Sequence, residues 1–281
     1  MRLLFRYRDY NENTVRELIE SELWHSHIRH LNDPFEHPFQ FDWDEVKIEN
    51  FGKIASSIGW STRGELIDCY LEGNTKQAFK KLEHWLKIQS DFLKLKMSET
   101  FICCFSRKCD EPLMWSHYSN GMQGLCFIYD EKMLINSDRL KLKEATYNTS
   151  VDKLTYRDFP ADTTKSSREY SFESGRDVDI YSTKRTAYYS NDLSYQKHER
   201  WKYEEEVRSV LFADDEIENQ KAGVIEKIPA EALKGVIIGS KMDKTNRKVI
   251  ESLCKERGIP VHVATPDREN YTVNINPSIS Y

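Results

Sequence analysis

The pattern of hydrophobic and polar positions changes period within the first twenty residues. Apolar and cationic residues mix over residues 3–8 in the manner of a strand, which places Arg6 and Arg8 on one face. Residues 11–13 supply helix-capping side chains, and the apolar positions that follow, up to Leu23, fall at helical spacing. The pattern therefore predicts an opening strand followed by a helix.

The rest of the chain divides into a helical region and several short apolar runs. Residues 44–97 have helical character, and their clearest part is a helix over residues 75–97 behind an Asn74 or Thr75 cap. Residues 100–105 and 124–129 are typical of buried strands. The C-terminal part predicts a strand at 236–239, a helix at 243–258 and strands at 259–264 and 271–275.

These elements predict an α+β fold with mixed or antiparallel sheets and an inserted helical segment. At 281 residues the chain is long enough for one large domain, and we expect a single domain over residues 1–281. The helical insertion covers about 44–97. A polar stretch at about 148–180, rich in Ser, Thr, Asp and Lys, predicts a loop, lid or insertion.

Composition narrows the class of protein. The charged fraction of 31% leaves no apolar run long enough for a membrane span, and the charged N-terminus is unlike a secretory signal, so we expect a cytosolic protein that does not bind membranes. The net charge of −5 argues against a general nucleic-acid coat protein. The six cysteines lack Cys-x-x-Cys spacing, and most are expected to be buried thiols.

Residues 201–208 contain the densest group of side chains that could form a chemical site. They combine aromatic side chains, carboxylates and an arginine ahead of an apolar run, which predicts a strand that enters the core. Side chains in a strand alternate between faces, so Glu204, Glu206 and Arg208 would project together. Two carboxylates and a guanidinium on one face form either a structural ion-pair cluster or a chemical site.

Several segments, taken together, resemble a widespread bacterial family of domains of unknown function. The shared landmarks are Asn32-Asp-Pro-Phe-Glu36, Leu113-Met-Trp-Ser-His-Tyr118 with Gly124 following, Lys197 with Trp201-x-Tyr-Glu-x-Glu-x-Arg208, and the closing Val236-Ile-Ile-Gly239. They follow one another along most of the chain. Such membership implies no reaction by itself.

The order of these features also resembles that of ADP-ribosyltransferases, which bind NAD between two small sheets. The common features are an arginine-bearing first strand, a middle segment rich in aromatic and hydroxyl groups, and a late Glu-x-Glu strand. The resemblance implies that Arg6 or Tyr7 takes the first-strand position and that Ser116 or Tyr118 takes the middle one. The expected fold is then ADP-ribosyltransferase-like.

The same resemblance implies that Glu206 is the catalytic glutamate and Glu204 the outer member of the pair. Cleavage of the bond between nicotinamide and ribose builds oxocarbenium character, which a fixed carboxylate stabilises. Glu204 would accept a proton from an acceptor or water. A guanidinium fork suits the diphosphate, and an aromatic ring suits the nicotinamide. The residues expected to bind NAD are Arg6, Tyr7, Arg8, Trp115, His117, Tyr118 and Arg208.

The resulting hypothesis is an NAD-consuming ADP-ribosyltransferase or NAD glycohydrolase, such as a bacterial toxin or phage-defence effector. NAD is the only cofactor that it requires, as a substrate, and the acceptor would be a protein or a nucleic acid. The oligomeric state is left open. One alternative is a ligand- or protein-binding regulatory module without turnover. Another is a metal-dependent nuclease, because Asp42-x-Asp44-Glu45-x-Lys47 loosely resembles a nuclease acid and lysine set, although it falls in a predicted helix.

Other motifs have plain structural interpretations. Glu-x-Glu also occurs at 20–22 and 216–218, so the spacing alone is weak. The histidines at positions 25, 27, 30 and 37 are interpreted as solvated side chains near a turn, rather than as zinc ligands. His117 either caps a turn, fills the core or takes part in the site.

Three further segments are expected to be structural. Residues 32–35 predict a turn with Phe35 anchored in the core, and a place in the pocket wall is the alternative. Cys103 and Cys104 are expected in the core. Lys197 and Trp201 lie four residues apart, so on a helix they would share a face, with the lysine stem packed on the indole or, as the alternative, the lysine binding phosphate.

Overall fold

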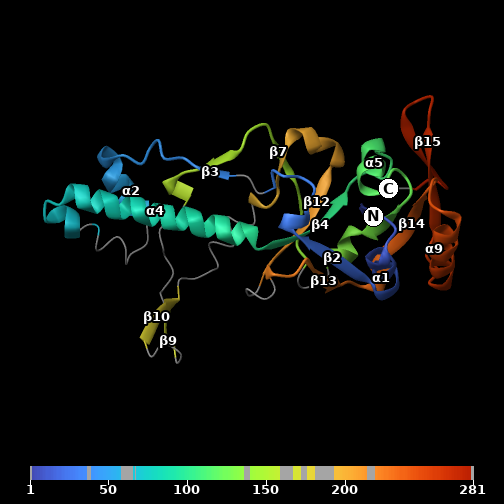
Figure 1. The fold of residues 1–281 in the computed structure, drawn as a ribbon, viewed down its shortest axis with the longest axis horizontal. Coiled ribbons are helices and arrows are strands. Elements are labelled where there is room, and N and C mark those ends of the chain that lie inside the picture. The colour runs from blue at the N-terminus through green and yellow to red at the C-terminus, as the bar shows by residue number, and fades with distance from the viewer. Residues whose placement is uncertain are drawn as a thin grey trace. The chain divides into compact units, whose positions relative to one another are not determined.

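The computed structural model in Figure 1 describes most of the chain, and it divides into two compact units. The described residues are 2–36, 39–57, 66, 68–135, 140–158, 167–171, 176–180, 193–213 and 219–279. Unit 1 comprises Met1–Glu36, Glu99–Thr149 and Tyr195–Tyr281, and unit 2 comprises His37–Ser98 and Ser150–Ser194.

Unit 1 is built on a ten-stranded, mostly antiparallel sheet, whose main path runs β13-β2-β4-β1-β5-β14-β15-β16, with β12 paired to β4 and β6. Its strands are β1 Leu3–Arg8, β2 Glu22–His27, β4 Thr100–Ser106, β5 Leu125–Asp130, β6 Leu142–Glu144, β12 Glu206–Phe212, β13 Gly223–Lys227, β14 Leu233–Gly239, β15 Val261–Asp267 and β16 Thr272–Asn276. Among the described residues of this sheet, only strands β14 and β15 pair in parallel. Two further strands, β7 Thr146–Asn148 and β11 Gln196–His198, form a separate parallel pair.

The sheet forks at β4. Strand β12 pairs with β4 from one end to the other, so it fills one edge. On the other edge, β2 pairs with β4 at Phe101 and Ile102, whereas β1 pairs with it at Ser106. Strands β1 and β2 therefore diverge beside residues 103–105.

The two faces of this sheet carry different side chains. Residues paired across strands project to the same face, so Phe5, Ser106 and Glu206 share one face. Because side chains alternate along a strand, Arg6 and Arg8 project to the opposite face. That face packs into a hydrophobic core that includes Leu4, Phe105 and Val207.

Short helices complete unit 1. They are α1 Glu12–Glu20, η1 Ile28–His30, α5 Pro112–Tyr118, α6 Glu131–Ile135, η4 Glu199–Glu204, η5 Ala230–Ala232 and α9 Lys244–Glu256. The side chain of Asn11 caps α1 by accepting a hydrogen bond from the Thr14 backbone, as the sequence predicts. The helix ends at Ser21 in the left-handed conformation, so Leu23 belongs to β2 and not to the predicted helix.

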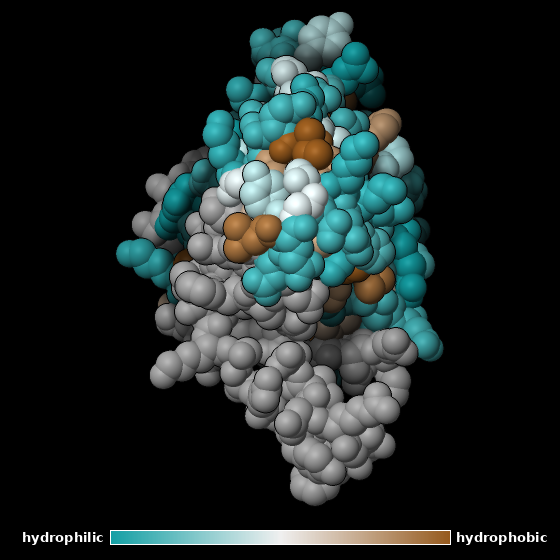
Figure 2. All heavy atoms as spheres, turned by 90° about the vertical axis from the view of Figure 1, so that its left-hand side faces the viewer, coloured by the Kyte–Doolittle hydropathy of each residue, from teal (hydrophilic) through white to brown (hydrophobic). Residues whose placement is uncertain are grey.

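Unit 2 is organised around one long helix. Its elements are β3 Phe39–Phe41, η2 Ile48–Asn50, α2 Phe51–Ser57, α4 Thr75–Ser98, β8 Asp152–Leu154, η3 Tyr156–Asp158, β9 Ser167–Ser171 and β10 Arg176–Ile180. The apolar stripe of α4 includes Leu82 and Leu86, which pack with Phe51 and Ile54 of α2. Figure 2, viewed from the side on which α2 and the start of α4 lie in Figure 1, shows single hydrophobic spots on a mainly hydrophilic described surface.

The predicted α+β class is confirmed, and so are the predicted strand at 3–8 and the long helix behind Thr75. Within 44–97 the described residues are not all helical, because Asp44 and Glu45 lie in a turn. The expected insertions at about 44–97 and 148–180 fall mostly within unit 2, and much of the second lies outside the described residues. A single domain stays a prediction, as does the likeness to ADP-ribosyltransferases.

Two expectations about the side chains and helices can be checked directly. All six cysteines are free, and five are buried, whereas Cys104 is half-buried. Among the described helices, none combines the length and the apolar character that crossing a bilayer requires.

Candidate functional site

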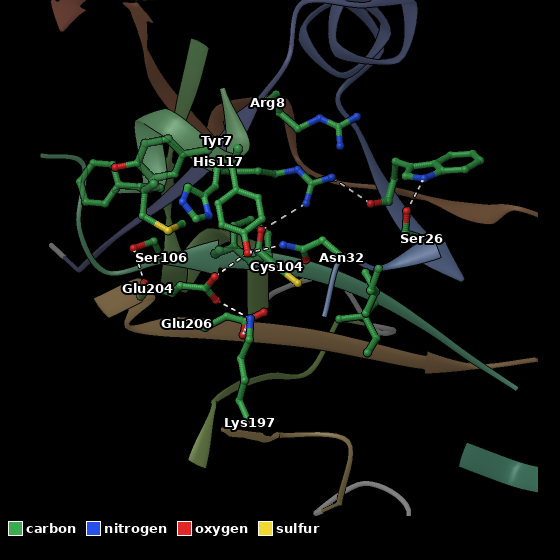
Figure 3. Close-up of a pocket in the computed structure, with 18 of the residues that line it drawn as sticks. Tyr7, Arg8, Ser26, Asn32, Cys104, Ser106, His117, Lys197, Glu204 and Glu206 are labelled. Carbon is green, nitrogen blue, oxygen red and sulfur yellow. Dashed lines mark hydrogen bonds and ion pairs between the residues drawn. The ribbon is translucent and has the colours of Figure 1, made fainter. Parts of the chain in front are cut away.

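A pocket of about 280 Å³ opens at the fork of the unit 1 sheet. It is lined by β1, β2, β4 and β12, by α5, and by the loop that contains Asn32 and Glu36. Figure 3 shows side chains from these separate segments turned towards one another. The pocket therefore collects residues that are far apart in sequence.

A lysine joins the two glutamates at one end of this pocket. Glu206 projects from the first residue of β12 and Glu204 from the last residue of η4, and both are buried. The Lys197 ammonium group from β11 forms ion pairs with Glu204 Oε2 and, at 3.0 Å, with Glu206 Oε2. Lys197 Nζ also lies 5.1 Å from the centroid of the Trp201 ring. The predicted contact between Lys197 and Trp201 is confirmed, although Lys197 lies on a strand and not on a helix.

An arginine continues this chain of charges to the loop at residues 31–36. Arg208 is fully buried and binds Glu206 through Nε and Nη2, each at 3.0 Å. It also donates to both carboxylate oxygens of Glu36, at 2.7 and 2.8 Å. Such a two-pronged pair fixes the orientation of both partners. Arg208 thus holds the glutamates in place, and its guanidinium does not line the pocket.

The two glutamates have opposite pKa shifts. Burial would raise the pKa of Glu206, but the charges of Arg208 and Lys197 outweigh it and bring the pKa to about 2. Burial raises the pKa of Glu204, and the attraction of Lys197 opposes this rise without cancelling it. Glu206 therefore stays ionised at neutral pH, whereas Glu204 is the stronger base of the pair.

A tyrosine connects Glu204 to the loop of residues 31–36. The Tyr118 hydroxyl donates to Glu204 Oε1 at 2.5 Å and accepts from the Asn32 amide at 3.0 Å. The loop itself is fixed by Asp33, which accepts from the Phe35 backbone at 2.9 Å. The predicted turn is thus confirmed, but Phe35 is 68% exposed and does not anchor it in the core. Asn32 lines the pocket, which was the alternative for residues 32–35, and Glu36 lines it as well.

The backbone at Glu205 brings the two glutamates together. The sequence predicts one continuous strand for 201–208, but residues 199–204 form the 3-10 helix η4 and β12 begins at Glu206. Glu205 adopts the left-handed conformation, with φ 41°, and its N–H donates to Lys202 O at 3.2 Å. Glu204 and Glu206 are therefore neighbours through a turn and not through strand alternation, whereas Glu206 and Arg208 share a strand face as predicted.

Arg6 occupies the fork of the sheet, with all of its donors directed at protein groups. It donates to Trp24 O at 2.9 Å and to Cys104 O at 3.3 Å, and it pairs with Glu17 at 2.9 Å. It is 4% exposed. These bonds satisfy backbone carbonyls of β2 and β4 where the strands separate, so the role of Arg6 is to stabilise the fork.

Arg8 differs from Arg6. The Nε of Arg8 forms an ion pair with Glu17 at 3.6 Å, and no hydrogen-bond partner for this atom is found among the described residues. Burial and the neighbouring Arg6 lower the pKa of Arg8 from its usual value. Arg8 lines the pocket, where Figure 3 shows it well apart from the labelled glutamates. It is the cation of the predicted set that is best able to bind an anion.

The remaining predicted residues divide between pocket and core. Tyr7 lines the pocket and donates to Lys108 O at 3.0 Å, while its ring packs edge-on against Trp115 at 5.2 Å. Trp115 is buried and donates to Cys109 O, so it supports the wall from behind. His117 is exposed at the pocket, with its ring centroid 6.3 Å from those of Tyr118 and Tyr203.

Sequence reasoning did not place Glu36, Cys104 and Lys197 in this site, and it gave Asn32 a place there only as an alternative. The landmark segments contained Asn32, Glu36 and Lys197, which was the available signal. Cys104 shares the pocket face of β4, and burial followed by the charge of Glu206 raises the pKa of its thiol. Cys103 lies in the core as predicted, whereas Cys104, also predicted in the core, is half-buried and lines the pocket.

The other predicted clusters do not assemble into a metal site. His25 and His27 are buried, at 0% and 3% exposure, so the prediction of solvated side chains is wrong for them. His25 bonds to Ser209 and His27 to Asn219, at 3.0 and 2.7 Å, while His37 lies outside the described residues. In the part of the chain that the structure describes, no three His, Cys, Asp or Glu side chains are grouped to hold a metal ion.

A protein-family model matches residues 114–209 of the chain. No curated protein and no solved structure matches the chain. The matched stretch begins in α5 and ends in β12, so it contains His117, Tyr118, Lys197 and the Glu204–Arg208 segment. The predicted resemblance to a domain of unknown function is thereby confirmed for this stretch: residues 114–209 match the model of the family described as protein of unknown function (DUF2971).

Proposed function

We propose that the pocket of unit 1 binds NAD and cleaves its bond between nicotinamide and ribose, as a cytosolic ADP-ribosyltransferase or NAD glycohydrolase. The observation that carries this proposal is the separation of charge. On the β1 side two arginines, Arg6 and Arg8, share one carboxylate, Glu17. On the β12 side three carboxylates share two cations, in the network of Glu36, Glu204, Glu206, Lys197 and Arg208.

A pocket with one cationic and one acidic end suits a ligand with the opposite polarity. NAD has an anionic diphosphate in its middle and a cationic nicotinamide ring at one end. Arg8 is the group for the diphosphate, because it lines the pocket and its ion pair with Glu17 is long, at 3.6 Å. The aromatic rings of Tyr118 and His117 line the pocket and offer a surface for the nicotinamide, and the Tyr118 hydroxyl contacts Glu204 directly.

The two glutamates would divide the chemistry according to their pKa values. As the bond from C1′ to the nicotinamide nitrogen breaks, its electron pair passes to the ring, which leaves as neutral nicotinamide. Glu206, ionised with a pKa of about 2, stabilises the positive charge on the ribose. An acceptor hydroxyl or water then forms the new bond to C1′, and Glu204, whose pKa is raised, takes its proton.

A second function is favoured by the engagement of Glu206. Both of its oxygens lie 3.0 Å from cationic nitrogens of Lys197 and Arg208, which offset the charge that an oxocarbenium ion would meet. This observation supports a binding module that holds a dipolar ligand without turnover. The two functions predict different effects of the same substitution.

The test measures nicotinamide release from NAD and, separately, NAD binding by calorimetry. The variants are Glu206→Gln, Glu204→Gln and the control Glu205→Gln, which removes an equal charge at an exposed side chain paired with Lys108. For an enzyme we expect release to fall at least a hundredfold in Glu206→Gln, with little change in binding and none in Glu205→Gln.

Lysate is added to supply acceptors, and circular dichroism verifies that each variant is folded. Binding without release in the wild type, weakened in the Glu204 and Glu206 variants, would support the binding module instead. A folded wild-type protein that neither binds NAD nor releases nicotinamide would contradict both functions.

A further inference from the structure

Helix α4 of unit 2 carries lysines along one side for most of its length. Lys76, Lys80, Lys87 and Lys94 are separated by four, seven and seven residues, and all four are exposed. These spacings are close to whole turns of an α-helix, so the four side chains form one stripe. From first to last it spans about 27 Å at the helical rise of about 1.5 Å per residue.

This lysine stripe is a concentration of positive charge on a chain whose net charge is −5. Helix α4 contains six lysines and two carboxylates, Glu83 and Asp91. Among the described residues, no ion-pair partner is found for Lys76, Lys80 or Lys87. Lys94 lies 4.0 Å from Asp91, with more than half of each side chain exposed, which is a weak pair. The stripe therefore keeps its charge available for a polyanion.

An aromatic groove adjoins the C-terminal half of the lysine stripe. Its volume is about 510 Å³, and it lies between α4 and the β3 segment, with Trp43 following that strand. Lys87 and Lys94 line it together with Phe39, Phe41 and Trp43, and Asp91, the weak partner of Lys94, lines it as well. The Trp43 ring is 42% exposed and is held by an edge-on contact with Phe41 at 4.5 Å. A flat aromatic face thus lies beside two cations.

We propose that this stripe and groove bind single-stranded nucleic acid. Phosphates would lie along the lysines, and a base would stack on Trp43, which is the combination by which proteins bind single strands without reading their sequence. The stripe is long enough for about eight phosphates at a stacked spacing of about 3.4 Å. A duplex would leave Trp43 unused, since its bases are already stacked. The proposal stands on unit 2 alone and does not require the pocket of unit 1.

The experiment measures fluorescence anisotropy of labelled twelve-residue oligothymidine and oligouridine with the full chain, between 50 and 200 mM salt. Stacking on one aromatic side chain contributes about 1–3 kcal/mol, so we expect Trp43→Ala to weaken binding roughly five- to hundredfold and Trp43→Phe to restore most of it. Each phosphate contact on a single strand contributes about 0.7 to the salt slope, so Lys87→Gln should reduce the slope by about 0.7.

Lys81→Gln is the matched control, because Lys81 is exposed on the same helix but turned about 100° from Lys80. Its slope and affinity should stay close to those of the wild type. Equal losses in Lys81→Gln and Lys87→Gln, or no binding at 50 mM salt, would overturn the proposal. So would retention on phosphatidylserine vesicles that depends on Lys87 and Trp43 while the oligonucleotides do not bind. Circular dichroism of each variant verifies that α4 is intact.

Discussion

The two faces of the unit 1 sheet each bury a cluster of charges, but they use them differently. On the pocket face, the Glu206 cluster consists of Glu36, Glu204, Glu206, Lys197 and Arg208. On the opposite face, the Glu17 cluster consists of Arg6, Arg8, Glu17 and Tyr129. The two clusters meet at one pocket, because Arg6 and Arg8 line it at the fork of the sheet together with Glu204 and Glu206.

The difference lies in what each cluster leaves unsatisfied. Arg6 donates to two backbone carbonyls and pairs with Glu17, and the Tyr129 hydroxyl donates to Glu17 at 2.9 Å. Most of the Glu17 cluster is therefore structural. The Glu206 cluster has more carboxylates than cations, and its three glutamates all line the pocket. Buried charge alone does not indicate a site. An imbalance of charge beside an open pocket does.

The largest effect is expected from removing the cation at the centre of the Glu206 cluster. Arg208→Met leaves Glu36 and Glu206 buried without their shared partner, so we expect a loss of about 3–5 kcal/mol in the free energy of unfolding. Urea denaturation followed by tryptophan fluorescence measures this. Adding Glu36→Gln to the Arg208 variant should recover part of the loss, because it removes one of the unpaired charges. A loss below about 1 kcal/mol in the single variant would contradict a structural role for Arg208.

Acid should separate the two glutamates of the pocket. The pKa of Glu206 is lowered to about 2 in the folded protein, so its stabilising effect is complete above its unfolded pKa and is lost as the pH falls towards 2. The stability advantage of the wild type over Glu206→Gln should therefore shrink between pH 5 and 2, by up to about 3 kcal/mol.

Glu204 should show the opposite sign in the same urea titrations. Its folded pKa is raised by burial, so protonation favours the folded state and the wild type should gain stability relative to Glu204→Gln as the pH falls. Parallel curves for the two variants would show that the environments of the two carboxyl groups do not differ as described.

A smaller effect is expected where the Glu206 cluster meets the solvent. Tyr118→Phe removes the hydroxyl that bridges Asn32 and Glu204, so we expect a loss of about 1–2 kcal/mol in stability. Without this donor the pKa of Glu204 should rise further, which a carbon-13 titration of the carboxyl group detects. Tyr203→Phe is the control, because that ring lies next to His117 and no Tyr203 hydrogen bond to Glu204 is found in the described residues. Equal shifts in both variants would contradict the bridge.

The smallest change in stability is expected for substitution of Arg8, which distinguishes it from Arg6 in the same Glu17 cluster. Arg8→Met should cost less than about 1 kcal/mol, because the ion pair with Glu17 is long, whereas Arg6→Met should cost several times more. If Arg8 binds the diphosphate, NAD affinity should fall about tenfold in the Arg8 variant. Calorimetry measures the affinity, and an unchanged value in a protein that binds NAD would remove Arg8 from the site.

Local sequence patterns predicted the positions of the helices and strands better than they predicted which strands pair with each other. Strand β1 and helices α1, α4 and α9 have clear periodicity, and Asn11 and Asp243 cap α1 and α9, so the positions of these elements followed from the sequence. The fork at β4 did not, because it depends on which strands share an edge. That choice is made by long-range packing and is absent from any local window.

The site shows the same division. The common face of Glu206 and Arg208 follows from strand alternation, and it was predicted. The place of Glu204 depends on the left-handed backbone conformation of Glu205. Residues other than glycine seldom adopt this conformation, and no sequence pattern indicated it. Lys197 arrives from β11, a strand that pairs with β7, so its contact with both glutamates could not be inferred from spacing.

Unit 2 is made of two separate stretches, which has a consequence for handling the protein. The chain passes between the units at four places, after Glu36, Ser98, Thr149 and Ser194. One cut by a protease at any of these connections would leave the remaining three covalently intact. Neither unit can be obtained as a simple N- or C-terminal truncation, and isolating unit 1 requires two new peptide connections in place of two excised segments.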